Sequence, residues 1–380
     1  MAMEDCIYIN RIASFFPNKP VSNEEMEEYL GRIGNIDSRV KPIILKQNGI
    51  KSRYYALDKH QHITHSNAEL ASAAINKLLE KEGKHNHIEL LACGTSTPDQ
   101  ILPSHASMVH GLSFDYPMEI YSLSGVCLTG ITALKTAYMS IKTGNTNNGV
   151  CTASELASPS FLARFYEEEY KNLKELEQKP HLAFEKDFLR YMLSDGASAV
   201  LLSNSPNEDA SLEINWIELI SYANKHPACM YMGADFTEEG VLKGWKEFSE
   251  EELLKQSIFS CKQNVRLLNE NIIERFVDAI QHSLDKHNVT TDSIRYVIPH
   301  ISSMYFYHRL EEGILERNLD LPTSKWFTNL TWVGNVGSVA PFAALDELLR
   351  TKPLDKGDQI LLLVPESGRF SFGIALLTYK

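Results

Sequence analysis

Short apolar runs rich in β-branched residues alternate with longer amphipathic runs along the whole chain. For example, leucine and alanine recur at helical spacing over residues 66–82, and an apolar run of strand length follows at 89–93. Such alternation is typical of α/β proteins. We predict further strands over 121–124, 149–153, 197–202, 295–299, 359–365 and 372–379, and helices over 131–142, 249–288 (with breaks) and 341–350.

The second half of the chain repeats one feature of the first. In each half, a turn of small residues carries a polar residue, Cys127 or Asn335, directly into an expected helix. A chain of 380 residues has room for two ordinary domains or for one large duplicated domain. The repeated turn favours duplication, with similar halves over 1–205 and 206–380. A charged stretch at about 158–191 predicts a solvated helical insertion in the first half.

Acidic residues outnumber basic ones, 49 against 37, and the net charge is −12. Such a surface repels nucleic acid and anionic lipid. Residues 1–14 lack the apolar core of a signal peptide, and no run approaches the roughly 20 apolar residues that span a bilayer. We therefore expect a cytoplasmic protein that binds neither nucleic acid nor membrane. Its six cysteines should be free thiols, and their spacing suits no metal site.

Cys127 is the first candidate functional residue. It lies in the turn between the expected strand 121–124 and the expected helix 131–142, with Gly125 and Gly130 beside it. A nucleophile on such an elbow is exposed, and the N–H groups at the start of the helix favour a thiolate and can bind an oxyanion. A free cysteine is more often a small buried apolar residue. Local sequence alone leaves these two interpretations balanced.

His300 and Asn335 are two further candidate functional residues, and both could act together with Cys127. His300 directly follows the expected strand 295–299, at the end where α/β proteins place groups that face a ligand. Asn335 lies in a turn with glycines on either side. Together the three residues suit one reaction, in which the cysteine attacks a thioester while histidine and asparagine donate hydrogen bonds to the enolate of a second thioester. This chemistry needs no metal or other cofactor.

Ordered motifs along nearly the whole chain resemble those of the thiolase-fold condensing enzymes, most of all the ketoacyl-carrier-protein synthase III branch. Three of them read SGVC at 124–127, SDGASA at 194–199 and GNVGS at 334–338. The others are NGIKSR at 48–53, the segment 95–107 that contains LPS, PHISS at 299–303 and SGRFSFG at 367–373.

This resemblance implies a fold and a set of roles. The family fold is a doubled α/β core in five layers, αβαβα, and its members are homodimers. Cys127 would be the acylated nucleophile, and His300 and Asn335 the pair that stabilises the enolate. The backbone N–H groups of Cys127 and Gly368 would form the oxyanion hole. The residue before Pro103 reaches the partner's acyl pocket in that family and is often Phe, so Leu102 implies a roomier substrate tunnel.

Departures from the family pattern point to a specialised branch. A Trp and an Arg that grip coenzyme A appear here as Ile43 and Gln47, which favours a carrier-protein-bound or another acyl thioester donor. Ser303 replaces the amide that ends the histidine motif, and so changes the tunnel. Arg369 replaces a glycine of the C-terminal motif. The stretch 95–100 and the charged insertion are similar to those of ketosynthases that join two β-ketoacyl chains into cyclohexanediones, precursors of dialkylresorcinols.

Several alternatives stay open. Glu155 follows the expected strand 149–153 and is either an acid or base for a cyclising step, or a carboxylate that caps a helix or pairs with an arginine. An acyltransferase of the same fold would pass its acyl group to an oxygen or nitrogen atom, but such relatives tend to alter the asparagine that Asn335 preserves. A cysteine hydrolase fits the chemistry but not the ordered motifs. A non-catalytic dimer partner that sets chain length would be expected to lose the nucleophile.

Overall fold

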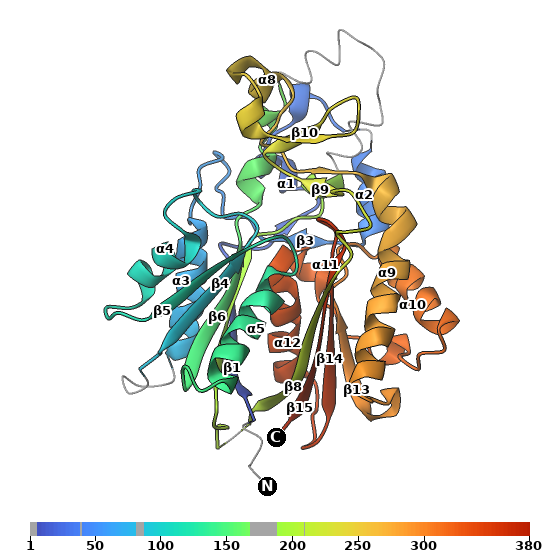
Figure 1. Ribbon diagram of the computed structural model, residues 1–380. Coiled ribbons are helices and arrows are strands. Elements are labelled where there is room, and N and C mark those ends of the chain that lie inside the picture. The colour runs from blue at the N-terminus through green and yellow to red at the C-terminus, as the bar shows by residue number, and fades with distance from the viewer. Residues whose placement is uncertain (1–5, 39, 81–86, 168–187, 209) are drawn as a thin grey trace.

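The computed structural model describes residues 6–38, 40–80, 87–167, 188–208 and 210–380 (Figure 1). Its main sheet has the strand order β13-β14-β15-β8-β1-β7-β6-β4-β5. The strands of the first half are β1 (Tyr8–Phe15), β4 (Leu90–Thr95), β5 (Glu119–Ser124), β6 (Asn148–Glu155) and β7 (Gly196–Ser203). Those of the second half are β8 (Leu212–Ser221), β13 (Ile294–Pro299), β14 (Gln359–Glu366) and β15 (Ser371–Tyr379).

The two halves of this sheet have the same internal pattern. In the first half β4 runs parallel to β5 and β6, and β6, β7 and β1 follow in antiparallel order. In the second half β13 runs parallel to β14, and β14, β15 and β8 follow in antiparallel order. A parallel bridge between Val297 and Trp326 takes the place of β5. The repeated order supports the proposed halves 1–205 and 206–380, whose exact boundary stays a prediction.

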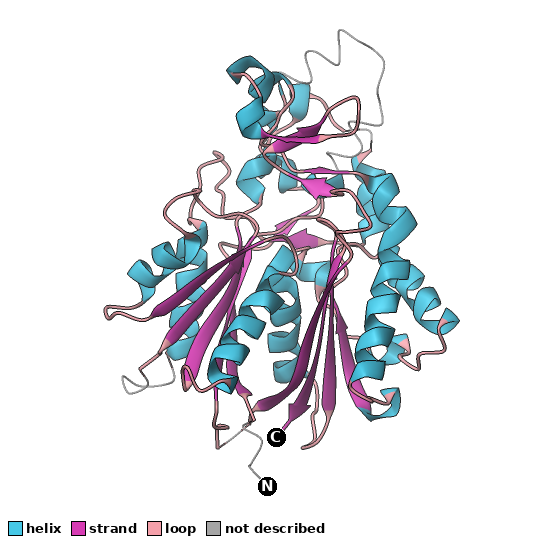
Figure 2. Cartoon of the chain, in the orientation of Figure 1, coloured by secondary structure: helices cyan, strands magenta, loops and turns pink. Residues whose placement is uncertain are grey.

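The main helices are arranged around the two half-sheets in five layers (Figures 1 and 2). One outer layer contains α3 (Asn67–Leu79) and α4 (His105–Ser113), and the other contains α9 (Val265–Lys286) and α10 (Tyr305–Glu316). Between the half-sheets lie α5 (Thr129–Lys142) and α12 (Ala340–Thr351). The α/β fold in αβαβα layers is therefore confirmed.

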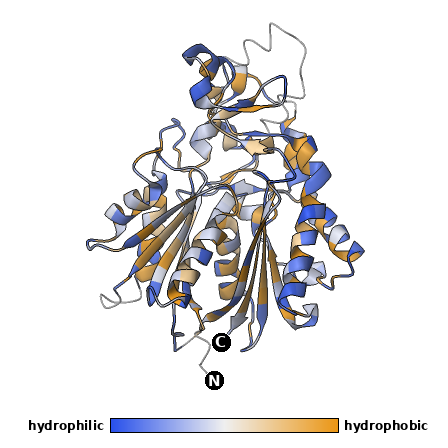
Figure 3. Cartoon of the chain, viewed as in Figure 1, coloured by the Kyte–Doolittle hydropathy of each residue, from blue (hydrophilic) through white to orange (hydrophobic). Residues whose placement is uncertain are grey.

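Successive residues of a strand point to opposite faces of the sheet, and here both sets are apolar, so helices cover both faces. Leu91 and Cys93 of β4 pack with α3 and α4, whereas Leu90 and Ala92 face the central layer. Figure 3 shows the same pattern as apolar strands and helix faces that meet inside the molecule. The central helices approach closely at Gly130, where an added Cβ would lie 2.5 Å from the carbonyl oxygen of Ser338. Such contact requires glycine at this position.

Smaller elements gather at one end of the sheet. We call residues 222–263 the cap (Figure 1, top). In the cap β9 (Met230–Tyr231) pairs with β12 (Lys262–Gln263), and β10 (Ala234–Phe236) pairs with β11 (Leu242–Gly244). The cap also contains α8 (Glu250–Lys255). Near it lie α1 (Met26–Leu30), α2 (Lys41–Asn48), β2 (Val21–Ser22), β3 (Ser52–Arg53) and α11 (Leu330–Val333).

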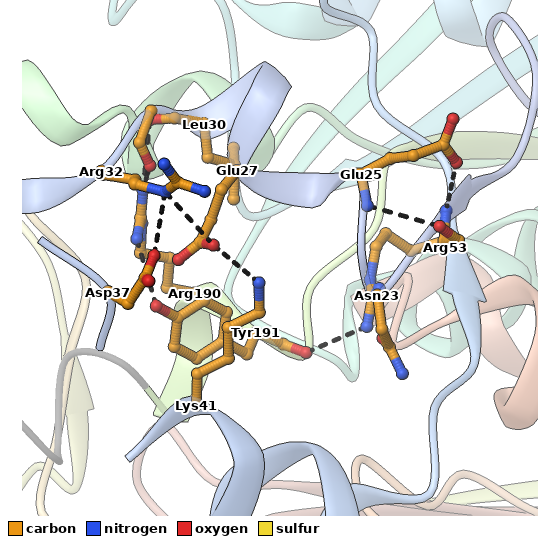
Figure 4. A network of polar contacts seen from close by, with 12 residues as sticks. Asn23, Glu25, Glu27, Leu30, Arg32, Asp37, Lys41, Arg53, Arg190 and Tyr191 are labelled. Atoms are coloured by element: carbon orange, nitrogen blue, oxygen red, sulfur yellow. Dashed lines mark hydrogen bonds and ion pairs between the residues drawn. The ribbon is translucent and has the colours of Figure 1, made fainter. Parts of the chain in front are cut away.

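A polar network fixes this end of the molecule (Figure 4). The fully buried Arg53 donates to Asn23 Oδ1 at 2.6 Å and to the carbonyl oxygen of Tyr191 at 3.3 Å. Arg190 donates to the carbonyl oxygen of Leu30 at 3.2 Å. The network joins α1 and β3 to the segment that leads into β7, because each guanidinium binds carbonyl or amide oxygens from another part of the chain.

Most expected elements form, and the differences have local causes. The expected helix at 66–82 is α3, with Ser66 and Glu69 as a capping box; residues 81–86 lie outside the described part. The expected long helix at 249–288 is interrupted, because α8 ends at Lys255 and the chain forms β12 before α9 begins. The strands β1 and β8 were not predicted.

The insertion predicted at about 158–191 lies mostly at 168–187, outside the described residues. Its described ends are mostly buried, with Arg164, Phe165 and Glu167 as exposed exceptions. Phe161, Leu162, Phe188 and Leu189 are buried in the core cluster that includes α9 and β14. The prediction of a solvated segment was therefore wrong for these four residues. It was based on the high charge of the stretch as a whole, which outweighed the apolar residues at its two ends.

Candidate active site

Cys127 lies on the elbow between β5 and α5, as expected. Its side chain is 9% exposed and borders two cavities, one of about 280 Å³ and one of about 50 Å³. The first cavity lies under the cap and the second lies between the elbow and the helices α9 and α10. A nucleophile between two cavities can be reached from two directions.

His300 borders the smaller cavity together with Cys127. It follows β13, and its backbone N–H donates to the carbonyl oxygen of Leu363 at 2.7 Å. Among the described residues, neither ring nitrogen of His300 has a hydrogen-bond partner. Burial lowers the pKa of the imidazole to about 4, so that at neutral pH the ring is uncharged and offers one donor and one acceptor.

Asn335 borders the larger cavity with Cys127, and lies with His300 around a third, small cavity. The backbone of Asn335 is fixed on both sides, because its N–H donates to Met192 O at 3.0 Å and its carbonyl oxygen accepts from Ser194 N at 2.9 Å. Its side-chain Oδ1 accepts from Gly337 N at 3.1 Å. The Nδ2 end of the amide is therefore left to donate. The structure thus brings Cys127, His300 and Asn335 together from the two halves.

The elbow differs from expectation in its electrostatics. The N–H groups on both sides of Cys127 donate to Glu366 Oε2, from Val126 at 2.9 Å and from Leu128 at 3.2 Å. Burial, followed by the charges of Glu366 and Glu155, raises the pKa of the Cys127 thiol well above its usual value. The expected thiolate-stabilising start of the helix is therefore occupied by a carboxylate, and the resting sulfur is a thiol.

Glu366 was not identified from the sequence. It is the last residue of β14 and follows an apolar run, in the same way that His300 follows β13. A carboxylate at the carboxyl end of a buried strand was the available signal. Cys261 was also missed: it borders the larger cavity with Cys127, and burial raises the pKa of its thiol to about 12.

Glu155 borders the larger cavity but is held by hydroxyl groups. Its carboxylate accepts from Ser96 Oγ at 2.5 Å, from Thr97 Oγ1 at 2.9 Å and from Ser338 Oγ at 2.5 Å. The N–H of Ser338, at the start of the segment that leads into α12, also donates to it at 3.3 Å. Burial raises the pKa of Glu155. The hydrogen bond from the N–H of Ser338, just before α12, agrees with the expectation that Glu155 caps a helix. No described arginine is bonded to Glu155, so the expected ion pair is not found.

Gly368 approaches the elbow closely. A Cβ at this position would lie 3.0 Å from Val126 Cγ2, and the Gly368 carbonyl oxygen accepts from Cys229 N at 2.8 Å. In the described part of the chain, the N–H groups of Cys127 and Gly368 donate to no other group. Both remain candidates for the oxyanion hole.

The two predicted tunnel residues lie away from these cavities. Leu102 is 82% exposed on the segment between β4 and α4, and it borders neither cavity. Ser303 is fully buried and accepts at 3.3 Å from the N–H of Tyr305 at the start of α10. Its neighbour Ser302 borders both cavities, as Cys127 and Ser367 also do.

The walls of the cavities differ. The smaller is mainly apolar, with polar groups only where Cys127, His300, Ser302 and Ser367 meet it. Its apolar side chains come from α9, α10 and their flanks: Leu268, Ile272, Ile273, Phe276, Ile301, Phe306, Leu310 and Pro365. The larger mixes apolar and polar side chains, and its cap side consists of Met230, Tyr231, Met232, Cys261 and Gln263. The larger offers both apolar contact and hydrogen bonds to a ligand, whereas the smaller offers mainly apolar contact.

The described residues contain neither a metal-binding cluster nor a membrane-spanning helix. No group of three or more His, Cys, Asp or Glu side chains there is placed to hold a metal ion. None of the described helices is both long and apolar enough to cross a bilayer.

Comparison with known proteins adds the family context. Residues 284–379 match the family model described as 3-oxoacyl-[acyl-carrier-protein] synthase III C terminal. The chain is 24% identical to a β-ketoacyl-[acyl-carrier-protein] synthase III of Clostridium perfringens over 364 residues, which cover 96% of each chain. Among solved structures it is similar to AbyA1, a tetronic acid condensing enzyme, with a TM-score of 0.75, 20% identity, and 98% and 99% of the two chains covered.

A second similar structure is Xanthomonas campestris OleA with bound lauric acid and lauroyl-CoA. The TM-score is 0.72 and the identity 17%, over 99% of this chain and 100% of that one. At such identities the structural likeness concerns the fold.

Proposed function

We propose that this chain, a synthase III-like protein with the thiolase fold, is a condensing enzyme that loads an acyl or β-ketoacyl chain on Cys127 and joins it to a second acyl substrate. The observation that carries the proposal is the position of Cys127 between two cavities, with His300 at one and Asn335 at the other. Access from two sides suits a condensation, in which one chain is held on the sulfur while the second is brought to it.

The first half-reaction is the transfer of an acyl group to sulfur. Cys127 Sγ attacks the thioester carbonyl, the carrier thiol leaves, and the thiol proton of Cys127 passes to the departing sulfur. Because the resting thiol is protonated, this transfer requires a proton acceptor within reach, and the neutral imidazole of His300 has a free nitrogen that can relay it. The N–H groups of Cys127 and Gly368 would stabilise the oxyanion.

The second half-reaction is carbon–carbon bond formation. The second thioester loses CO₂ or a proton from its α-carbon, and the resulting enolate oxygen accepts hydrogen bonds from His300 and from Asn335 Nδ2. The α-carbon then attacks the carbonyl of the acylated Cys127, and the sulfur leaves as a thiolate. It becomes a thiol by taking up the proton removed from the α-carbon or, after loss of CO₂, a proton from solvent. A neutral histidine suits this role, because it donates a hydrogen bond without the cost of a buried charge.

We propose a β-ketoacyl chain for the larger cavity and an alkyl chain for the smaller one. The amide of Gln263 in the larger cavity can donate a hydrogen bond to a second keto oxygen, and the mainly apolar walls of the smaller cavity suit hydrocarbon. Two β-keto groups held beside Cys127 would allow a second, cyclising condensation to a cyclohexanedione, with Glu155 as its acid or base. Exposed Ile43 and Gln47 on α2 favour a carrier-protein-bound donor over coenzyme A.

We also propose a homodimer that assembles through the edge of the sheet at β5. Ile101 and Leu102 are 73% and 82% exposed beside this edge, and Tyr121 of β5 is 39% exposed. Large apolar side chains on a strand edge are unfavourable in water unless another chain covers them. We expect this dimer to act in the cytoplasm, where its free thiols stay reduced.

Intact-mass measurement tests the function. Wild-type protein incubated with saturated and β-ketoacyl thioesters should gain one acyl group, and Cys127→Ala should gain none. Absence of an adduct on the wild type, or an adduct that persists in Cys127→Ala, would contradict the proposed mechanism. Analysis of the product from paired β-ketoacyl thioesters then separates cyclisation from simple condensation. Acyl transfer to an added alcohol or amine, without a new carbon–carbon bond, would favour the alternative acyltransferase.

A further inference from the structure

Glu366 is a partly buried carboxylate next to the nucleophile, and the proposed half-reactions do not use it. It ends β14 in the second half, whereas the elbow belongs to the first half. Its Oε2 atom accepts hydrogen bonds from Val126 N and Leu128 N. Gly125 lies beside this contact, since a Cβ built there would be 3.5 Å from the same oxygen.

The two hydrogen bonds determine how the elbow presents Cys127. Because the N–H groups before and after the cysteine are bound to one atom, the backbone of the turn is fixed on both sides of the nucleophile. The N–H of Cys127 itself remains free to bind an oxyanion. Gly368, the other candidate donor, is only two residues from Glu366 in the chain, so one carboxylate ties together both sources of the oxyanion hole.

We propose that Glu366 is a positioning residue that aligns Cys127 and Gly368 for acyl transfer by holding the elbow through its two flanking N–H groups. This role concerns the nucleophile of the proposed function. It differs from a contribution to folding alone, because it makes the reactivity of Cys127 depend on an acceptor and on a charge that come from the other half of the molecule.

The charge of Glu366 can be detected through the pKa of the Cys127 thiol. The ionisable groups around the Cys127 sulfur are Glu366, Glu155, Cys261 and His300. Of the three acidic neighbours, Glu366 contributes most to the raised pKa of the thiol. Removal of its charge, with the acceptor oxygen kept, should therefore make Cys127 ionise at lower pH. A purely structural carboxylate far from the sulfur would not have this effect.

Glu366→Gln and Glu366→Ala test the proposal. Alkylation of Cys127 by iodoacetamide, followed by peptide mass spectrometry over a pH series, gives the midpoint of thiol ionisation without any acyl substrate. In Glu366→Gln the midpoint should fall by about half a pH unit or more. Acyl loading should stay within about threefold of wild type in Glu366→Gln, because the amide oxygen still accepts, and fall about tenfold or more in Glu366→Ala.

Glu218→Gln is the matched control. Glu218 is also a largely buried carboxylate, but it binds Lys286 and His287 rather than the elbow, so its variant should keep the wild-type midpoint. An unchanged midpoint in Glu366→Gln would overturn the proposal, as would wild-type acyl loading in Glu366→Ala. If Glu366→Ala does not fold, the proposal is judged by the midpoint of Cys127 ionisation in Glu366→Gln alone. Because alkylation needs no acyl substrate, its result stands even if the protein proves not to condense thioesters.

Discussion

The Glu155 carboxylate accepts a hydrogen bond of 2.5 Å from Ser338 Oγ, and so ties the end of β6 in the first half to the turn that carries Asn335 in the second. The same carboxylate binds Ser96 and Thr97 at the end of β4. It therefore links three backbone segments around the larger cavity.

Glu155→Ala should destabilise the protein and weaken condensation together. Removal of the carboxylate leaves the hydroxyls of Ser96 and Ser338 without their buried acceptor, at a cost of about 2–4 kcal/mol of the free energy of unfolding. Glu155→Gln keeps one acceptor oxygen and should cost less. Denaturant unfolding of both variants measures this difference, and equal stability of Glu155→Ala and wild type would contradict it.

Gly337→Ala should destabilise the protein, because the added methyl group would press against the side chain of Glu155. Gly337 has φ +54°, and an added Cβ would lie 3.1 Å from Glu155 Cγ. Gly240 also has a positive φ, +79°, but nothing lies within 4 Å of its Cβ position. Both alanine variants bear the backbone strain, and only Gly337→Ala should lose a further ~1–3 kcal/mol from overpacking. Equal losses in the two unfolding curves would show that the contact with Glu155 relaxes freely.

Asn335→Asp should separate the two half-reactions. The carboxylate has no N–H₂ group to donate to an enolate, so the rate of carbon–carbon bond formation should fall by about a hundredfold or more. Loading of Cys127 should continue, because the cysteine and His300 are unchanged. Intact mass reports the acyl adduct and chromatography reports the product. Loss of both steps in equal measure would assign Asn335 to acyl transfer instead.

Stability in acid should depend on His300. Its folded pKa of about 4 lies below the unfolded value of 6.5, so the folded state disfavours the protonated ring. Stability from this residue is therefore present above pH 6.5 and is lost as the pH falls from about 6.5 towards 4, by up to ~3 kcal/mol. His300→Asn should lose less stability across that window. His105 has a similarly lowered pKa and titrates in both proteins, so only the difference between their unfolding curves is assigned to His300.

Charges at the exposed edge of the sheet should break the proposed dimer. We expect the double variant Ile101→Asp/Leu102→Asp to be a monomer by light scattering, because two carboxylates would be buried at the interface. Leu315→Asp, at a position that is 61% exposed on α10, should keep the oligomeric state of the wild type. A wild-type mass that is already that of a monomer would refute this interface.

The order of strands and helices could be predicted because its signals are local. The capping box at Ser66 and the apolar runs at β4, β13 and β14 depend only on neighbouring residues. β1 was missed because Asn10 and Arg11 interrupt its apolar residues, and the interruption suits the bulge at its pairing with β7.

The site could be predicted in its residues but not in its electrostatics. Cys127, His300 and Asn335 were recognised from ordered motifs, each with its own local turn. Glu366 was missed because its significance depends on contact with Val126 and Leu128, some 240 residues away in the chain. The expected thiolate was not found, because burial first and the charge of Glu366 second raise the pKa of the Cys127 thiol, and neither can be read from the local sequence.

The matching strand order of the two half-sheets gives the elbow of Cys127 and the turn of Asn335 equivalent places, one before α5 and the other before α12. Two identical subunits related by a twofold axis would have to carry the same residue at both places. Joined in one chain, the two copies of the turn are free to differ, and one can become a nucleophile while the other becomes a hydrogen-bond donor. The covalent link between the halves is thus what permits an asymmetric reaction on a nearly symmetric scaffold.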